Sequence, residues 1–118
     1  MIPPAAIEEF QLLLSALANG PGTAIIVEGK KDVAALRKLG LDKERIIQLE
    51  RRPLFEVSEA VAAKYRDAVI LTDLDAEGKK LYAALNSSLQ HLGVRIDNRL
   101  RNFLFRKTKV RQIEGLIL

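Results

Sequence analysis

Three short apolar runs, each followed by a stretch with helical spacing, constrain the fold of this chain more than any other feature. The runs lie at 24–27, 46–49 and 68–71. Short continuous apolar runs are typical of strands buried on both faces of a parallel sheet. Stretches with an apolar residue every three or four positions follow them, at 31–39, 56–65 and 77–92. This alternation predicts an α/β fold of the Rossmann-like kind, with a compact, mostly parallel sheet of about four strands and helices on both faces.

The 118 residues are enough for one domain, and two halves would each be too small to bury a core. A further helix is expected at 5–18, before the first apolar run. We therefore expect residues 1–22 to form a helical extension packed on the core and residues 23–118 to form the main domain. The tail shows a weaker pattern, with a basic stretch at 99–107 and a short apolar end at 113–118.

Composition excludes several kinds of site. The chain has no cysteine and a single histidine, His91, which rules out a disulfide scaffold, a thiol nucleophile and a multi-histidine metal site. No apolar run approaches the ~20 residues of a membrane span, and no secretory signal is recognisable. We therefore expect a cytoplasmic protein without membrane contact, whose chemistry depends on carboxylates.

Basic residues are concentrated in the last quarter of the chain. Residues 95–118 carry seven lysines and arginines against two acidic residues, whereas the whole chain has a net charge of only +4. A basic surface attracts phosphate backbones without reading sequence, although a solvated helix face would give the same composition.

The first apolar run leads directly into Glu28, Gly29, Lys30 and Asp32. A carboxylate directly after a buried strand lies at the carboxyl edge of the sheet, where ligands of parallel α/β folds bind. Gly29 is expected to permit a tight turn and a close backbone approach. Asp32 falls in the first turn of the next helix, where capping would explain it without any metal or substrate.

The third apolar run leads into a second acidic turn, with Asp73, Asp75 and Gly78. Two aspartates two residues apart on an extended backbone point the same way, and a hard cation relieves their repulsion. Mg²⁺ accepts few carboxylates and keeps waters, so Glu28, Asp73 and Asp75 are predicted to form one open metal site. Mn²⁺ suits the same oxygen ligands. The alternative to a metal site is a purely structural one, a capped turn at a helix start, where Gly78 allows close approach.

Together the two acidic turns resemble the motifs of Toprim domains. The segment Glu28-Gly29-Lys30-Lys31-Asp32 is similar to their EGxxD motif, and the segment 73–78 is similar to their DxDxxG motif. The resemblance covers roughly residues 23–115. The local sequence around the two motifs is most similar to small stand-alone Toprim proteins and to the Toprim domain of the 5S ribosomal RNA maturase.

The resemblance implies phosphodiester chemistry on RNA or DNA, in RNA processing or DNA repair. It assigns Glu28 as general acid/base or metal ligand, and Asp73 and Asp75 as Mg²⁺ ligands. Gly29, Lys30, Asp32 and Gly78 are candidate accessory residues. Contacts to nucleic acid are expected from the basic side chains Arg51, Arg52, Lys79, Lys80, Arg99 and Arg101.

Three functional alternatives stay open at this stage. The first is a Mg²⁺-dependent nuclease-like enzyme, and the second is a Toprim module that binds nucleic acid without cleaving it, within a larger complex. The third is a phosphotransfer enzyme of the haloacid dehalogenase type, but there the DxD strand opens the domain. A protein partner or a homodimer is compatible with all three. Phe103 and Phe105 in the basic tail are expected either to stack on bases or to anchor the tail to the core.

Overall fold

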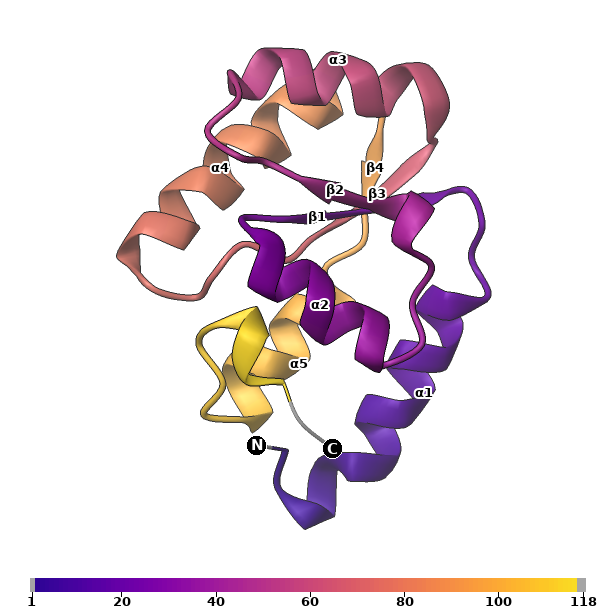
Figure 1. The fold of residues 1–118 in the computed structure, drawn as a ribbon, viewed down its shortest axis with the longest axis vertical. Helices are drawn as coiled ribbons and strands as arrows, with labels where there is room; N and C mark the ends of the chain where they lie inside the picture. The colour runs from indigo at the N-terminus through magenta and orange to yellow at the C-terminus, as the bar shows by residue number, and fades with distance from the viewer. Residues whose placement is uncertain (1, 117–118) are drawn as a thin grey trace.

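A computed structural model describes residues 2–116 of the chain, and Figure 1 shows its fold. A four-stranded sheet forms its centre, with all neighbouring strands parallel. Their order across the sheet is β2 (Ile46–Gln48), β1 (Thr23–Val27), β3 (Asp67–Ile70) and β4 (Arg95–Ile96). The α/β class and the parallel sheet predicted from the sequence are confirmed.

Five helices cover the two faces of the sheet. They are α1 (Ile7–Ala18), α2 (Lys30–Lys38), α3 (Leu54–Lys64), α4 (Ala76–His91) and α5 (Arg99–Lys107). Figure 1 shows α3 and α4 above the sheet, with α1, α2 and α5 below it. The described residues also contain three short 3-10 turns, η1 (Pro4–Ala6), η2 (Lys43–Arg45) and η3 (Ile113–Gly115).

Alternate residues of the strands supply two separate hydrophobic cores. On β1, Ile25 and Val27 face the core shared with α1, α2 and α5. Ala24 and Ile26 face the core shared with α3 and α4. Because side chains alternate along a strand, a strand buried on both faces must be apolar throughout, which is why the first run shows no alternation.

The first helix packs directly against the last. The rings of Phe10 on α1 and Phe103 on α5 stack with centroids 6.0 Å apart. Arg45, buried beneath β2, donates to the carbonyl oxygens of Leu17, Ala18 and Thr23, which ties the end of α1 to the start of β1. Within residues 2–116 the N-terminal helix thus shares a core with the sheet. Residues 117 and 118, which end the expected domain and its apolar tail, lie outside the described residues.

Two elements of the tail were not located from the sequence. Strand β4 has only two residues, and the exposed Arg95 is one of them, so no apolar run marks it. Helix α5 is strongly basic, and its buried side includes an arginine, Arg101. None of the described helices combines the length and apolarity needed to cross a membrane.

Candidate acidic site at the carboxyl edge of the sheet

The loops that follow β1 and β3 meet at the carboxyl edge of the sheet. Glu28 comes directly after β1, and its Oε2 accepts a hydrogen bond from the backbone N–H of Asp73, at 2.6 Å. Both residues are half-buried. A carboxylate from one strand end therefore binds the backbone that carries the carboxylate of the next.

Asp73 carries the most perturbed carboxyl group of this edge. Its Oδ1 lies 3.4 Å from the backbone N–H of Ile113, which donates to it. Burial, followed by the charges of Glu28, Asp32 and Asp75, raises the pKa of Asp73 from 3.8 to about 6. The cause is that an ionised carboxylate is poorly solvated here and repelled by its neighbours, and a bound cation would relieve both effects.

A hollow of about 540 Å³ opens over these groups. Its lining includes four acidic residues, Glu28, Asp32, Asp73 and Glu114, together with Lys30 and Lys31. Glu114 belongs to η3, which lies against α2. The C-terminal segment therefore contributes both a carboxylate and the Ile113 N–H to the acidic site.

Asp75 lies apart from this hollow. It is the N-cap of α4, and its Oδ1 accepts from the N–H of Gly78 at 2.8 Å. It is exposed and lines a different hollow, of about 390 Å³, with Lys109 and Arg111. Of the three residues predicted to form one open metal site, Glu28 and Asp73 line the same hollow, while Asp75 lines another and shows the capping geometry of the alternative.

The two motif glycines differ in what they require. An added Cβ at Gly78 would lie 2.8 Å from the Cα of Asp73 and closer still to its carbonyl group, so only glycine fits there. In contrast, Gly29 has an extended backbone with φ −144°, and a Cβ there would meet nothing within 4 Å. No atom of the described residues therefore approaches Gly29 closely, whereas the close approach expected at Gly78 is present.

Asp32 behaves as a capping residue. Its Oδ2 accepts from the backbone N–H of Gly29 at 3.0 Å, at the start of α2. Burial raises the pKa of Asp32, and the hydrogen bond from Gly29 opposes that rise. Asp32 also borders the hollow, so its charge acts on Asp73 although its oxygen is used by the helix.

Arg101 has a different role from the expected phosphate contact. It is 7% exposed, and its guanidinium donates to the carbonyl oxygens of Ile70, Thr72 and Asp73 at 3.1, 2.7 and 3.2 Å. It also packs over the ring of Tyr82, 4.5 Å from its centroid. Arg101 therefore holds the end of β3, and with it the backbone of Asp73, in place, and is not available to bind nucleic acid.

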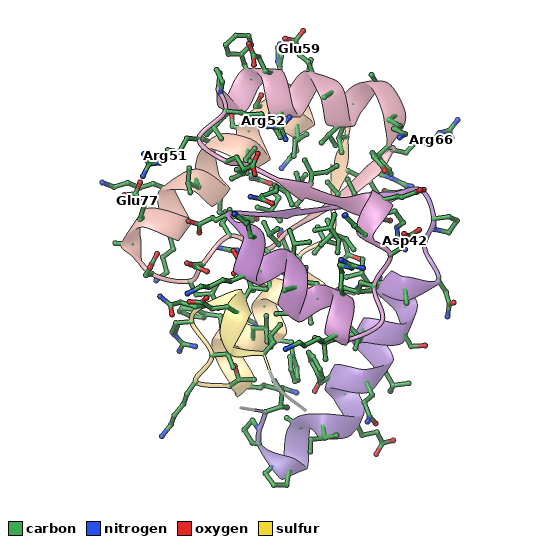
Figure 2. The ribbon with its side chains drawn as sticks, viewed as in Figure 1. Asp42, Arg51, Arg52, Glu59, Arg66 and Glu77 are labelled. Carbon is green, nitrogen blue, oxygen red and sulfur yellow. The ribbon has the colours of Figure 1, made fainter. Side chains whose placement is uncertain are left out.

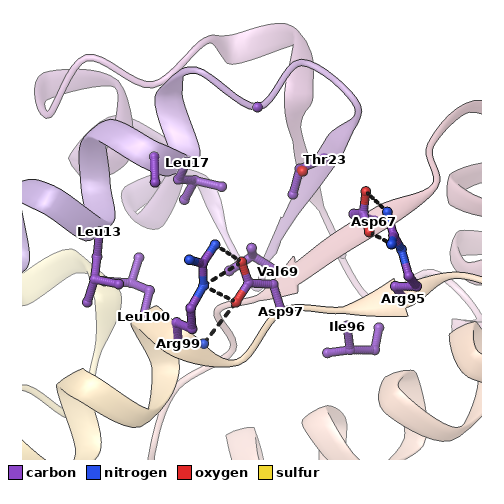
Figure 3. A pocket seen from close by; sticks show the side chains of 12 residues that line it. Leu13, Leu17, Thr23, Asp67, Val69, Arg95, Ile96, Asp97, Arg99 and Leu100 are labelled. Carbon is purple, nitrogen blue, oxygen red and sulfur yellow. Dashed lines mark hydrogen bonds and ion pairs between the residues drawn. The ribbon is translucent and has the colours of Figure 1, made fainter.

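Arg99 is also removed from the acidic hollow. It lines a third hollow, of about 480 Å³, together with Thr23 and Asp67, the first residues of β1 and β3. Figure 3 shows its guanidinium paired with Asp97, and Arg95 paired with Asp67, each at 2.8 Å. Because each arginine already has a carboxylate partner, this hollow presents little net charge.

The other basic candidates are exposed. Arg51 and Arg52 follow β2, and Arg51 has φ 61° in a turn closed by the Arg52 N–H and the Leu49 carbonyl, at 2.9 Å. Figure 2 shows Arg51 extending from the same side of the molecule as Glu77 at the start of α4. Lys30 begins α2, and Lys79 and Lys80 follow Asp75 on α4.

The donor atoms of the acidic site suit a hard divalent cation. All are carboxylate oxygens, and the charge crowding at Asp73 is what a cation would neutralise. Within residues 2–116, however, no three histidine, aspartate or glutamate side chains gather closely enough to hold a metal ion by themselves. The arrangement therefore fits an ion held by two carboxylates and completed by water or substrate, as Mg²⁺ accepts.

Two contributors to the site were not assigned from the sequence. Glu114 lies within the short apolar end at 113–118, and no pattern connects it to the acidic turns. The structural role of Arg101 had a signal, since Arg101 lies three residues before Leu104, at helical spacing on the side of α5 that is buried.

Fold and site together define an α/β protein with a parallel sheet and an acidic hollow at its carboxyl edge. The chain belongs to the UPF0292 family. It is 40% identical over 109 residues to a UPF0292 protein of Pyrococcus abyssi, covering 91% of this chain and 80% of that one. It is 34% identical over 95 residues to a UPF0292 protein of Methanocaldococcus jannaschii, covering 78% and 73%.

A solved structure has the same fold. It is described as a putative protein from Aquifex aeolicus, and it superposes with a TM-score of 0.81 at 26% identity, covering 96% of this chain and 100% of that one. No model of a known protein family matches the chain.

Proposed function

We propose that this chain is a cytoplasmic Toprim-type protein that holds Mg²⁺ with Glu28 and Asp73 and acts on phosphodiester bonds of RNA or DNA. The observation that carries the proposal is the 2.6 Å contact between Glu28 Oε2 and the Asp73 N–H, which joins the ends of β1 and β3 at the hollow that both side chains line. The order and spacing of the two acidic turns, which resemble the Toprim motifs, support it.

The residues present suit this chemistry. Mg²⁺ is commonly bound by one or two carboxylates together with water and substrate phosphates, so Glu28 and Asp73 suffice as protein ligands. When bound, the ion would neutralise charge on the phosphate and orient the attacking oxygen. One Glu28 oxygen binds the Asp73 N–H, and the other can accept a proton from a nucleophile. Mn²⁺ is the alternative ion.

The test is cleavage of labelled structured RNA, single-stranded DNA and duplex DNA, each with Mg²⁺, Mn²⁺ or EDTA. Glu28→Gln and Asp73→Asn keep the size of each side chain and remove its charge. Glu59→Gln makes the same change on the exposed face of α3, which Figure 2 shows away from the acidic loops. We expect metal-dependent products from the wild type and Glu59→Gln only. Cleavage that survives in Glu28→Gln and Asp73→Asn would refute the assignment.

A second function has a specific observation in its favour. Asp75 caps α4 and lines a separate hollow, and no three acidic or histidine side chains of the described residues converge on one ion. These features suit a module that binds nucleic acid without cleaving it, alongside a protein partner or a second copy. Salt-sensitive binding without products in any metal would select this function over the nuclease.

A further inference from the structure

Phe105 is an exposed aromatic residue on α5. Its side chain is 47% exposed, whereas Phe103, two residues earlier on α5, is 4% exposed and stacks on Phe10. Of the two roles expected for these rings, Phe103 has the anchoring one, because it holds α5 to the core. Phe105 faces solvent, where stacking on a base is open to it.

Two cations lie against the ring of Phe105. Lys79 Nζ is 5.0 Å from the ring centroid, and Arg111 Cζ is 5.2 Å from it. Both distances fall within the range of cation–π attraction. A ring held by two positive charges presents an aromatic surface and phosphate-binding groups at the same place.

The backbone groups of the same two residues contact the second acidic turn. The backbone N–H of Lys79 donates to the carbonyl oxygen of Asp75 at 2.9 Å. The carbonyl oxygen of Arg111 accepts from the N–H of Leu74, between the two aspartates, at 2.6 Å. Arg111 and Lys109 also line the hollow of about 390 Å³ that contains Asp75. The aromatic surface therefore lies beside the turn that carries Asp73 and Asp75, and Arg111 connects it to the hollow at Asp75.

We propose that Phe105, with Lys79 and Arg111, stacks an unpaired base of a single-stranded nucleic acid whose backbone continues to the acidic hollow. This inference rests on the proposed function and adds that the polymer is single-stranded at the site. Bases inside a duplex have their faces covered by their neighbours, so a protein ring reaches only an unpaired base. The cations then contact the flanking phosphates, which fixes position without reading sequence.

The charge of the surroundings favours nucleic acid over an uncharged apolar partner. Lys79 and Arg111, at the ring, and Lys109, which lines the adjacent hollow with Arg111, are all exposed. Lys107 differs, because its Nζ pairs with Glu9 on α1 at 2.5 Å. A strand carrying one phosphate per base complements an aromatic ring that lies beside the charges of Lys79 and Arg111.

Binding can be tested without cleavage, with the full chain in EDTA. Fluorescence anisotropy would compare single-stranded RNA, single-stranded DNA and the corresponding duplexes of one sequence. Phe105→Leu removes the ring but keeps apolar volume, Phe105→Tyr keeps the ring, and Phe55→Leu is the matched control at a phenylalanine on α3 that is 62% exposed. A 2-aminopurine base moved along the strand reports stacking directly, through quenching.

We expect single strands to bind more tightly than duplexes, and the RNA and DNA arms to identify the polymer. Phe105→Leu should weaken single-strand binding roughly 5- to 150-fold, as for loss of one base–aromatic stack, and should abolish the quenching. Phe105→Tyr and Phe55→Leu should bind as the wild type does. Lys79→Gln should lower the slope of log affinity against log salt by about 0.7, which tests the surface without touching the ring.

The proposal is overturned if Phe105→Leu binds single strands as well as the wild type, or if duplexes bind equally well. It is also overturned if the protein binds no nucleic acid but binds an acidic peptide at this surface. Failure of the proposed function is distinguishable, because stacking with no metal-dependent product rejects the nuclease and leaves the single-strand surface intact. Cleavage that persists with unchanged binding of Phe105→Leu rejects only the surface.

Discussion

Replacing Gly78 by alanine tests how closely the second acidic turn is packed. In an exposed helix the change would stabilise the protein by about 1 kcal/mol, because alanine is the better helix former. Here the new Cβ would lie 2.8 Å from the Cα of Asp73 and nearer still to its carbonyl group. Both partners are backbone atoms, so the clash cannot be relieved by rotating a side chain.

The expected magnitude follows from two opposing effects. Overpacking a tight site costs about 1–3 kcal/mol, and sometimes more. A shift of α4 would also disturb the buried bond from Thr72 Oγ1 to the Gly78 carbonyl oxygen, at 2.7 Å, which contributes about 1 kcal/mol. After the gain in helix propensity is subtracted, we expect Gly78→Ala to lower the free energy of unfolding by about 1–3 kcal/mol.

The assay is urea unfolding followed by circular dichroism, with Gly22→Ala as the control. A Cβ at Gly22 would meet nothing within 4 Å, so that variant should unfold within about 0.5 kcal/mol of the wild type. If Gly78→Ala is as stable as the wild type or more so, helix propensity dominates and the reasoning about backbone approach is wrong.

Three further substitutions test the acidic edge. Because the raised pKa of Asp73 makes the folded state bind more protons than the unfolded state between pH 3.8 and about 6, stability should fall as pH rises through this window. Asp73→Asn should remove that fall. A free energy of unfolding that changes with pH in the same way in the variant and the wild type would contradict it. Arg101→Met should lower the free energy of unfolding by roughly 2–4 kcal/mol, since buried carbonyls lose their donor, and no loss in urea unfolding would reject its positioning role. Asp75→Ala should cost about 0.5–2 kcal/mol as a lost helix cap, in the same assay without metal, and an unchanged midpoint would argue against the cap.

Local signals in the sequence were sufficient for the elements that build the centre of the sheet. The runs at 24–27, 46–49 and 68–71 correspond to β1, β2 and β3 within one residue at each end. Their apolar character follows from burial on both faces, which is a requirement that acts at each position separately. The edge strand β4 lacked this signal, because it pairs through only two residues and on one side alone.

The candidate site likewise combines features that local sequence determines with features that only the tertiary structure decides. The sequence determined which carboxylates stand at strand ends, because each directly follows a buried run, and it indicated that a glycine near the start of α4 allows close approach. Only the tertiary structure decided that Glu28 binds the Asp73 backbone, that Arg101 is buried beneath it and that Glu114 borders the same hollow. These contacts join residues that are separated by at least 28 positions along the chain, and no local spacing encodes such pairs. They arise because the parallel sheet brings its strand ends to one edge and the C-terminal segment returns to cover it.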